Sequence, residues 1–228
     1  MGKNDNGNNG RTELVFVVDR SGSMGGLESD AIGGFNSMLS KQRTIAGECR
    51  VTTLLFDHRI ETLHNHLDIR EVNDLTSRDY WVRGSTALLD AIGLAIDRMI
   101  VTQRHTAAAY RAQHVLFVII TDGYENASRR YSLHQIKQMI TYERERYHWE
   151  FVFLGANIDA EQTAGDFGIS PRCATDFHAD GQGIKASFEA VACAATAVRG
   201  GADLEDLSAP DFLGGVRDDY RSRRRMKR

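Results

Sequence analysis

Three oxygen-bearing side chains follow an apolar stretch near the start of the chain. Val15–Val18 leads directly into Asp19, and Ser21 and Ser23 come next at every second position. In a turning loop, this spacing can aim the three side chains at one point. Carboxylate and hydroxyl oxygens are the ligands of hard divalent cations such as Mg²⁺, which takes six-fold geometry at about 2.1 Å. The loop therefore predicts part of a magnesium site.

Two later residues can complete this oxygen cluster. Thr86 lies in a Gly-Ser-Thr sequence that opens a predicted helix, and Asp122 follows the most apolar stretch, residues 114–121. If Asp19 and Asp122 end neighbouring parallel strands, they meet at the sheet edge where ligands bind. Neutral hydroxyls do not cancel the charge of the ion. If the aspartates acted mainly through water, a coordination position would stay free for the carboxylate of a partner, and the site would bind an acidic residue rather than carry out a reaction.

The cluster resembles the metal-ion-dependent adhesion site (MIDAS) of von Willebrand factor A (VWA) domains. All five positions of that pattern are present in order, as Asp19-x-Ser21-x-Ser23, Thr86 and Asp122. The resemblance implies that the three hydroxyls are direct or near-direct ligands and that both aspartates often act through water. It implies Mg²⁺ as the cofactor, with Mn²⁺ or Ca²⁺ as alternatives. It also implies strand order 3-2-1-4-5-6, and the compact chain is most similar to intracellular bacterial or phage members, which often work beside an ATPase.

The rest of the chain alternates apolar strands with amphipathic helices, which predicts an open, doubly wound, mostly parallel α/β sheet covered on both faces. We expect about six strands, at 13–18, 50–56, 59–66 (an antiparallel edge strand), 114–121, 149–155 and 172–177. We expect helices at 27–43, 87–101, 133–147 and 182–198, with a shorter one that ends near Gly168. Residues 67–83 are polar and irregular, with room for a short helix. The predicted domains are a disordered segment 1–11, a VWA-like domain 12–199 and a loosely held tail 200–228 with a basic end.

Composition bounds the function classes. The net charge is −3 with seven Arg or Lys and two Asp in residues 217–228, a net +5, so the remainder carries −8. This balance does not favour nucleic acid, and a solvated basic tail is favoured over one that binds phosphates. No apolar run reaches the roughly 18 residues of a membrane span, and no signal peptide is evident. The three cysteines are read as buried thiols in a reducing compartment, so we expect a soluble cytoplasmic protein.

Residues beside the cluster suggest a rim that contacts a partner. Arg20 puts a cation inside the loop, where it can screen the site or pair with a partner acid, and Met24 follows Ser23 directly. Glu125 can position a metal-bound water or belong to the rim, but a solvated loop acid is favoured for it. His64 and His66 project to the same side of a strand, but an edge-strand surface is favoured over a metal site. The fingerprint G-x-G-x-x-G and the P-loop lysine are absent, which counts against a nucleotide.

The interpretation that these residues favour is a non-enzymatic, Mg²⁺-dependent adhesion or adaptor module. It captures an Asp or Glu carboxylate of a protein partner, for which an ATPase of the same operon is a candidate, and involves no membrane. Two alternatives stay open at this point. One is a metal-dependent phosphoesterase or hydrolase, because two acids would lie near a divalent ion. The other is a nucleic-acid-associated protein that acts through the basic tail.

Overall fold

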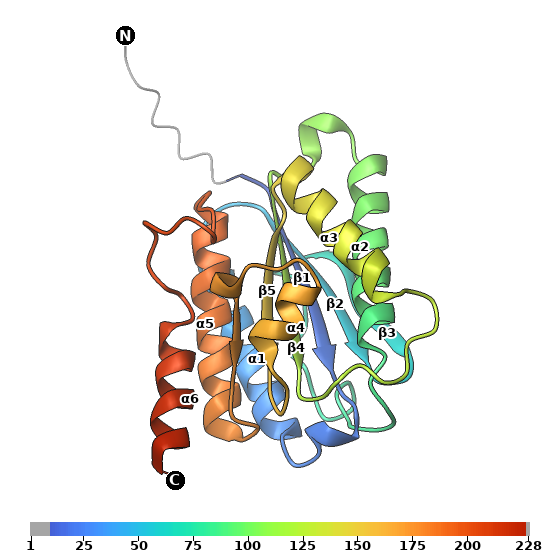
Figure 1. Cartoon of the computed structure of the whole chain (residues 1–228). Coiled ribbons are helices and arrows are strands. Elements are labelled where there is room, and N and C mark those ends of the chain that lie inside the picture. The colour runs from blue at the N-terminus through green and yellow to red at the C-terminus, as the bar shows by residue number, and fades with distance from the viewer. Residues whose placement is uncertain (1–9, 227–228) are drawn as a thin grey trace.

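Six strands form one sheet in the computed structural model, which describes residues 10–226 (Figure 1). The strand order is β3-β2-β1-β4-β5-β6, and only β2 and β3 pair antiparallel. The strands are β1 (Thr12–Asp19), β2 (Cys49–Phe56), β3 (Ile60–Asp68), β4 (His114–Thr121), β5 (Glu150–Gly155) and β6 (Ala174–Asp176). The predicted fold class and strand order are confirmed. The expected disorder of 1–11 falls almost entirely outside the described residues.

Helices cover both faces of the sheet. They are α1 (Glu28–Arg43), α2 (Leu88–His105), α3 (Leu133–Tyr147), α4 (Ala160–Asp166), α5 (Gly181–Arg199) and α6 (Gly214–Met226). α1 packs along α5 on one face, and α2 packs along α3 on the other (Figure 1). Ser132 and Gln135 form the capping box that starts α3. This reciprocal pair satisfies two N–H groups that the first helical turn leaves free.

The two central strands explain why the site can form. Every residue of β1 is buried, and so is every residue of β4 except His114. Such nearly continuous apolar runs are typical of strands covered on both faces. The parallel register pairs Val18 with Ile120, so Asp19 and Thr121 are the next residues on adjacent strands. Both strands therefore end at the same edge of the sheet, which lies at the bottom of Figure 1.

The C-terminal segment differs from the prediction of a loosely held tail. α6 packs against α5 and β6, and Leu213 and Val216 are buried there. The Arg217 guanidinium donates hydrogen bonds to three backbone carbonyls at the edge of the sheet, those of Pro171, Arg172 and Ala174. A short apolar contact and one arginine thus hold a helix whose sequence is otherwise polar.

Two further details qualify the predicted elements. The stretch 67–83 contains the end of β3 and turns but no helix, and its loops are held by hydrogen bonds such as the Asn36–Leu75 pair at 2.7 and 2.9 Å. None of the helices within residues 10–226 is long and apolar enough to cross a membrane.

Candidate metal centre

Asp19 is the last residue of β1 and is fully buried. One carboxylate oxygen accepts the Ser21 backbone N–H at 2.6 Å, and the other accepts the Thr121 hydroxyl at 2.6 Å. Burial raises the pKa of this carboxyl, and the two hydrogen bonds oppose that rise. The Tyr80 hydroxyl donates to the Asp19 carbonyl at 2.5 Å. Asp19 is therefore held firmly and organises the loop that follows it.

The serine loop turns directly after Asp19. Gly22–Met24 forms one turn of 3₁₀ helix, and the Ser21 and Ser23 hydroxyls lie 3.1 Å apart. The Gly22 N–H donates to the Gly84 carbonyl at 3.1 Å. This bond ties the serine loop to the segment that carries Thr86, so the predicted spacing does bring both serine oxygens to one point.

Thr86 reaches the same place from the loop before α2. Asn126 holds it from both sides, because its side-chain oxygen accepts the Thr86 N–H at 2.9 Å and its N–H donates to the Thr86 carbonyl at 3.0 Å. A methyl group added to Gly123 would lie 3.5 Å from both the Ser23 and the Thr86 hydroxyl oxygens. The hydroxyls of two loops thus converge over the glycine that follows Asp122.

Asp122 is buried beside these hydroxyls, yet neither of its carboxylate oxygens has a hydrogen-bond partner of ordinary geometry among the described residues. Burial raises its pKa, the nearby Ser23 hydroxyl opposes that rise, and the charge of Asp19 adds to it. A buried polar group without a partner is costly, and a charged one more so. A cation, or water bound to it, would satisfy these oxygens, and this donor set of hydroxyls and carboxylates fits Mg²⁺.

Histidines and cysteines offer no rival metal centre. Across residues 10–226, no group of three or more His, Cys, Asp or Glu side chains could hold an ion. His64 instead makes a 3.0 Å hydrogen bond with the Thr53 hydroxyl, and His66 lies 2.7 Å from the buried Glu13. Neither contact indicates a metal site, but His64 is buried, so the favoured interpretation of an edge-strand surface is wrong for His64.

The structure corrects the predicted rim. Arg20 and Met24 are fully buried and offer no surface to a partner. Glu125 accepts the N–H groups of Leu89 at the start of α2 and of Ala127 and Ser128 in its own loop, at 2.7 to 2.9 Å. It is thus a loop-bracing residue. Sequence reasoning missed three residues that hold the site, namely Tyr80, Thr121 and Asn126, of which only Thr121 had a signal, its place beside Asp122.

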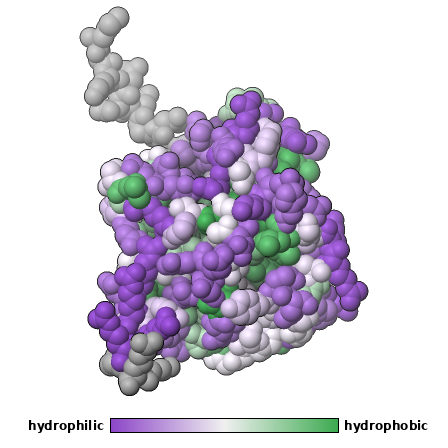
Figure 2. All heavy atoms as spheres, viewed as in Figure 1, coloured by the Kyte–Doolittle hydropathy of each residue, from purple (hydrophilic) through white to green (hydrophobic). Residues whose placement is uncertain are grey.

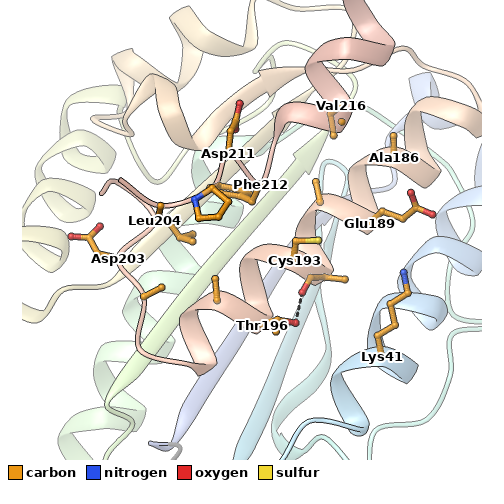
Figure 3. Close-up of a pocket in the computed structure, with 17 residues that line it drawn as sticks. Lys41, Ala186, Glu189, Cys193, Thr196, Asp203, Leu204, Asp211, Phe212 and Val216 are labelled. Carbon is orange, nitrogen blue, oxygen red and sulfur yellow. Dashed lines mark hydrogen bonds between the residues drawn. The ribbon is translucent and has the colours of Figure 1, made fainter. Parts of the chain in front are cut away.

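A separate groove of about 900 Å³ lies between α5, α6 and the segment that joins them (Figure 3). Its lining is mostly apolar and includes Leu204, Phe212 and Val216. Cys193 also lines it and is exposed, whereas Cys49 and Cys173 are buried. The prediction of three buried thiols therefore holds for two of them, because Cys193 lies on the outer side of α5.

Solved structures of other proteins share this arrangement of strands and helices. Proximal thread matrix protein 1 of the mussel byssus, solved with zinc in its MIDAS motif, is 15% identical with a TM-score of 0.58, over 82% of this chain and 46% of that one. The PilB minor pilin of Streptococcus sanguinis is 13% identical with a TM-score of 0.57, over 88% and 64%. The manganese-loaded TRAP protein of Plasmodium vivax is 15% identical with a TM-score of 0.53, over 78% and 72%.

These likenesses concern the fold. This chain spans a little under half the length of the mussel protein. No protein-family model matches it, and no curated protein matches it by sequence. The six-stranded sheet in the order 3-2-1-4-5-6, with one antiparallel pair and helices on both faces, gives the chain a VWA-like α/β fold.

Proposed function

We propose that this chain is a non-enzymatic, Mg²⁺-dependent binding module that captures a carboxylate of a protein partner. The observation that carries the proposal is the pair of buried Asp122 oxygens, which have no hydrogen-bond partner of ordinary geometry in the part of the chain that the structure describes and lie next to the converging Ser23 and Thr86 hydroxyls. With Asp19 and Ser21 these residues are the proposed metal-binding set. Mn²⁺ and Ca²⁺ are the alternative ions for the same oxygens.

The geometry favours binding over catalysis. Both oxygens of Asp19 already accept hydrogen bonds, so this carboxylate is engaged in holding the loop and is not free to attack a substrate. A bound Mg²⁺ would supply an electrophilic centre with mostly neutral hydroxyls around it. The group that best completes such a centre is an anion from outside, and an Asp or Glu side chain is the anion that proteins offer most readily.

The finer parts of the proposal concern partner and location. The candidate partner that we propose is an ATPase encoded in the same operon. We also propose a bacterial or phage origin and a location in the cytoplasm. The odd cysteine count supports a reducing compartment. The solved structures with a similar fold include a matrix protein and a pilus protein, so the cytoplasmic location stays a prediction. Identification of the partner tests this location.

Titration of Mg²⁺ into metal-free protein, followed by calorimetry, tests the site. Wild type should bind one ion, while Asp122→Asn and Thr86→Val should lose most of the affinity. The matched controls are Asp176→Asn, an acid at the end of β6 whose pKa burial also raises, and Thr175→Val, another buried threonine. Both controls should bind as wild type does. Equal binding by an Asp19→Ala, Ser21→Ala double variant would contradict the proposed site.

Capture of partners from the native host with and without EDTA tests the function itself. A protein that is retained only with Mg²⁺, and lost on Thr86→Val, supports the proposal. Turnover of generic phosphoesters that disappears with Asp122→Asn would instead favour the hydrolase. Nucleic-acid binding that is steep in salt and lost on deletion of 217–228 would favour the tail-based alternative.

A further inference from the structure

An ionic cluster connects the two loops of the candidate metal centre. Arg20 is fully buried although it stands between Asp19 and Ser21. Its guanidinium donates to Asp57 at 3.3 Å and to Glu61 at 2.7 Å. Asp57 is itself fully buried and also accepts the Arg83 guanidinium at 2.7 Å. One carboxylate thus joins an arginine of the serine loop to an arginine of the loop that leads to Thr86.

Backbone hydrogen bonds follow the same connections. The Arg20 N–H donates to Phe56 at the end of β2, and the Arg83 N–H donates to the Arg20 carbonyl at 2.9 Å. The Ala87 N–H, next to Thr86, donates to the Asp57 carbonyl at 2.9 Å. The side-chain cluster and these bonds together fasten the serine loop and the Thr86 loop to one point, the end of β2.

An exposed aromatic ring covers the outside of the cluster. The Arg83 guanidinium lies 4.2 Å from the centre of the Trp81 ring, and that of Arg20 lies 5.4 Å from it. Trp81 is 42% exposed, whereas Trp149 is 6% exposed. Cation–π contacts of this kind fix a ring in place, and so Trp81 reports on the position of both arginines.

Stability alone gives a poor account of such a cluster. The free energy that buried charges lose by leaving water offsets most of the free energy of their attraction. Well-packed apolar residues of similar volume often stabilise a fold as much or more. A fixed geometry for a neighbouring site is a better account, because groups that orient metal ligands control how well the ion is held. Loss of an orienting group typically costs about 10- to 100-fold in metal affinity.

We propose that Arg20, Asp57 and Arg83 are positioning residues of the candidate metal centre, which hold the Ser21–Ser23 loop against the Thr86 loop and thereby set the affinity for Mg²⁺. This inference rests on the proposed function. None of the three contributes an atom to the predicted ligand set. Their effect is on the separation of hydroxyls that belong to different loops.

The test measures Mg²⁺ affinity by calorimetry and metal-free stability by thermal unfolding for each variant. Asp57→Asn and Arg83→Gln should each weaken Mg²⁺ binding by about 10- to 100-fold. Arg83→Lys should recover part of the loss, because it keeps the charge near Asp57. The Arg83 side chain is 32% exposed, so its variants remain informative if Asp57→Asn does not fold.

Arg199→Gln is the matched control. Arg199 is 2% exposed and donates to the Gln42 and Ile45 carbonyls at 2.6 and 2.8 Å, at the opposite end of the fold. This variant should lose stability and keep its Mg²⁺ affinity. In a Trp149→Phe background, the fluorescence of Trp81 should shift with Arg83→Gln and stay unchanged with Arg199→Gln.

The outcomes separate the two proposals. Folded Asp57 and Arg83 variants that bind Mg²⁺ as wild type does would overturn the positioning role and leave the metal centre standing. Affinity lost equally in Arg199→Gln would also overturn it, because the effect would then follow global stability. Wild type that does not bind Mg²⁺ would overturn the proposed function and, with it, this inference.

Discussion

Replacing Asp122 with asparagine should stabilise the metal-free protein while it removes the response to Mg²⁺. The wild-type carboxylate is 1% exposed and lies near the charge of Asp19, and among the described residues it has no hydrogen-bond partner of ordinary geometry, although the Ser23 hydroxyl lies nearby. Asparagine has the same shape and carries no charge, so the variant removes the repulsion and most of the desolvation cost. The structure thus predicts that a functional residue lowers stability until its ligand binds.

The magnitude follows from the burial of the group. Asparagine keeps the cost of a neutral buried group without a partner, so the gain is the additional cost of the charge, which we take to be of the same order, about 1–3 kcal/mol. Taking about 2 kcal/mol, and about 2–4 °C for each kcal/mol in a chain of this size, we expect the metal-free Tm of Asp122→Asn to rise by about 4–8 °C. Mg²⁺ at 100 times its Kd should add about 2.7 kcal/mol to wild type and almost nothing to the variant.

The gain should also depend on pH in a defined direction. The pKa of Asp122 in the folded protein is raised above its ordinary value of 3.8. The protonated group therefore contributes to stability below pH 3.8, and this contribution to the free energy of unfolding is lost as pH rises through the folded-state pKa. The advantage of Asp122→Asn should therefore be present at pH 7 and vanish near pH 3.

Thermal unfolding in EDTA and in Mg²⁺, at both pH values, measures all three effects. Asp57→Asn is the contrasting control, since that buried acid has two arginine partners and its loss should destabilise the fold by about 3–5 kcal/mol. A metal-free Asp122→Asn protein that is less stable than wild type at pH 7, or one that Mg²⁺ stabilises as much as wild type, would refute the reasoning.

Three further predictions concern regions away from the metal centre. Burial, with the charge of Asp203, raises the pKa of Glu150 from 4.5 to about 7, so the contribution of this side chain to stability falls as pH rises across that range. Glu150→Gln should therefore raise the free energy of unfolding at pH 8 by about 1–2 kcal/mol, after allowance for partial exposure, and leave it unchanged near pH 4. Urea titrations at both pH values measure the difference. Cys193 should react with a maleimide in the folded protein, whereas burial, which raises the pKa of the Cys49 and Cys173 thiols to about 12, should protect both until unfolding, and mass spectrometry of labelled peptides decides this. Arg217→Ala should cost about 2 kcal/mol, because three edge carbonyls lose a charged donor, and a urea midpoint equal to that of wild type would contradict this role.

The sequence predicts those parts of the fold that depend on local pattern. The buried runs of β1 and β4 stand out because strands covered on both faces need apolar residues almost throughout. The Ser132–Gln135 capping box is equally local, and it marks the start of α3 correctly. The five oxygen-bearing residues can be found because their types and order form a known pattern.

α6 shows where local pattern fails. Its sequence from 214 to 226 is strongly polar, Val216 is its one buried apolar residue between 214 and 225, and such a peptide would be marginal as an isolated helix. Contacts with α5 and β6, and the carbonyl bonds of Arg217, stabilise it in the folded chain. Figure 2 shows this region as a hydrophilic ridge at the lower left, which explains why composition alone suggested a solvated tail.

The two aspartates of the site show what only tertiary structure can reveal. In sequence they are alike, since each follows an apolar strand, and the pattern assigns both to the same indirect role. In the fold they differ, because Asp19 accepts two hydrogen bonds, whereas within residues 10–226 Asp122 accepts none of ordinary geometry. One donor is the Thr121 hydroxyl, 102 residues away in the chain. Asp19 is thus committed to shaping the loop, and Asp122 keeps its oxygens for a ligand, so the same change to asparagine should disturb the metal-free loop at position 19 and relieve it at position 122.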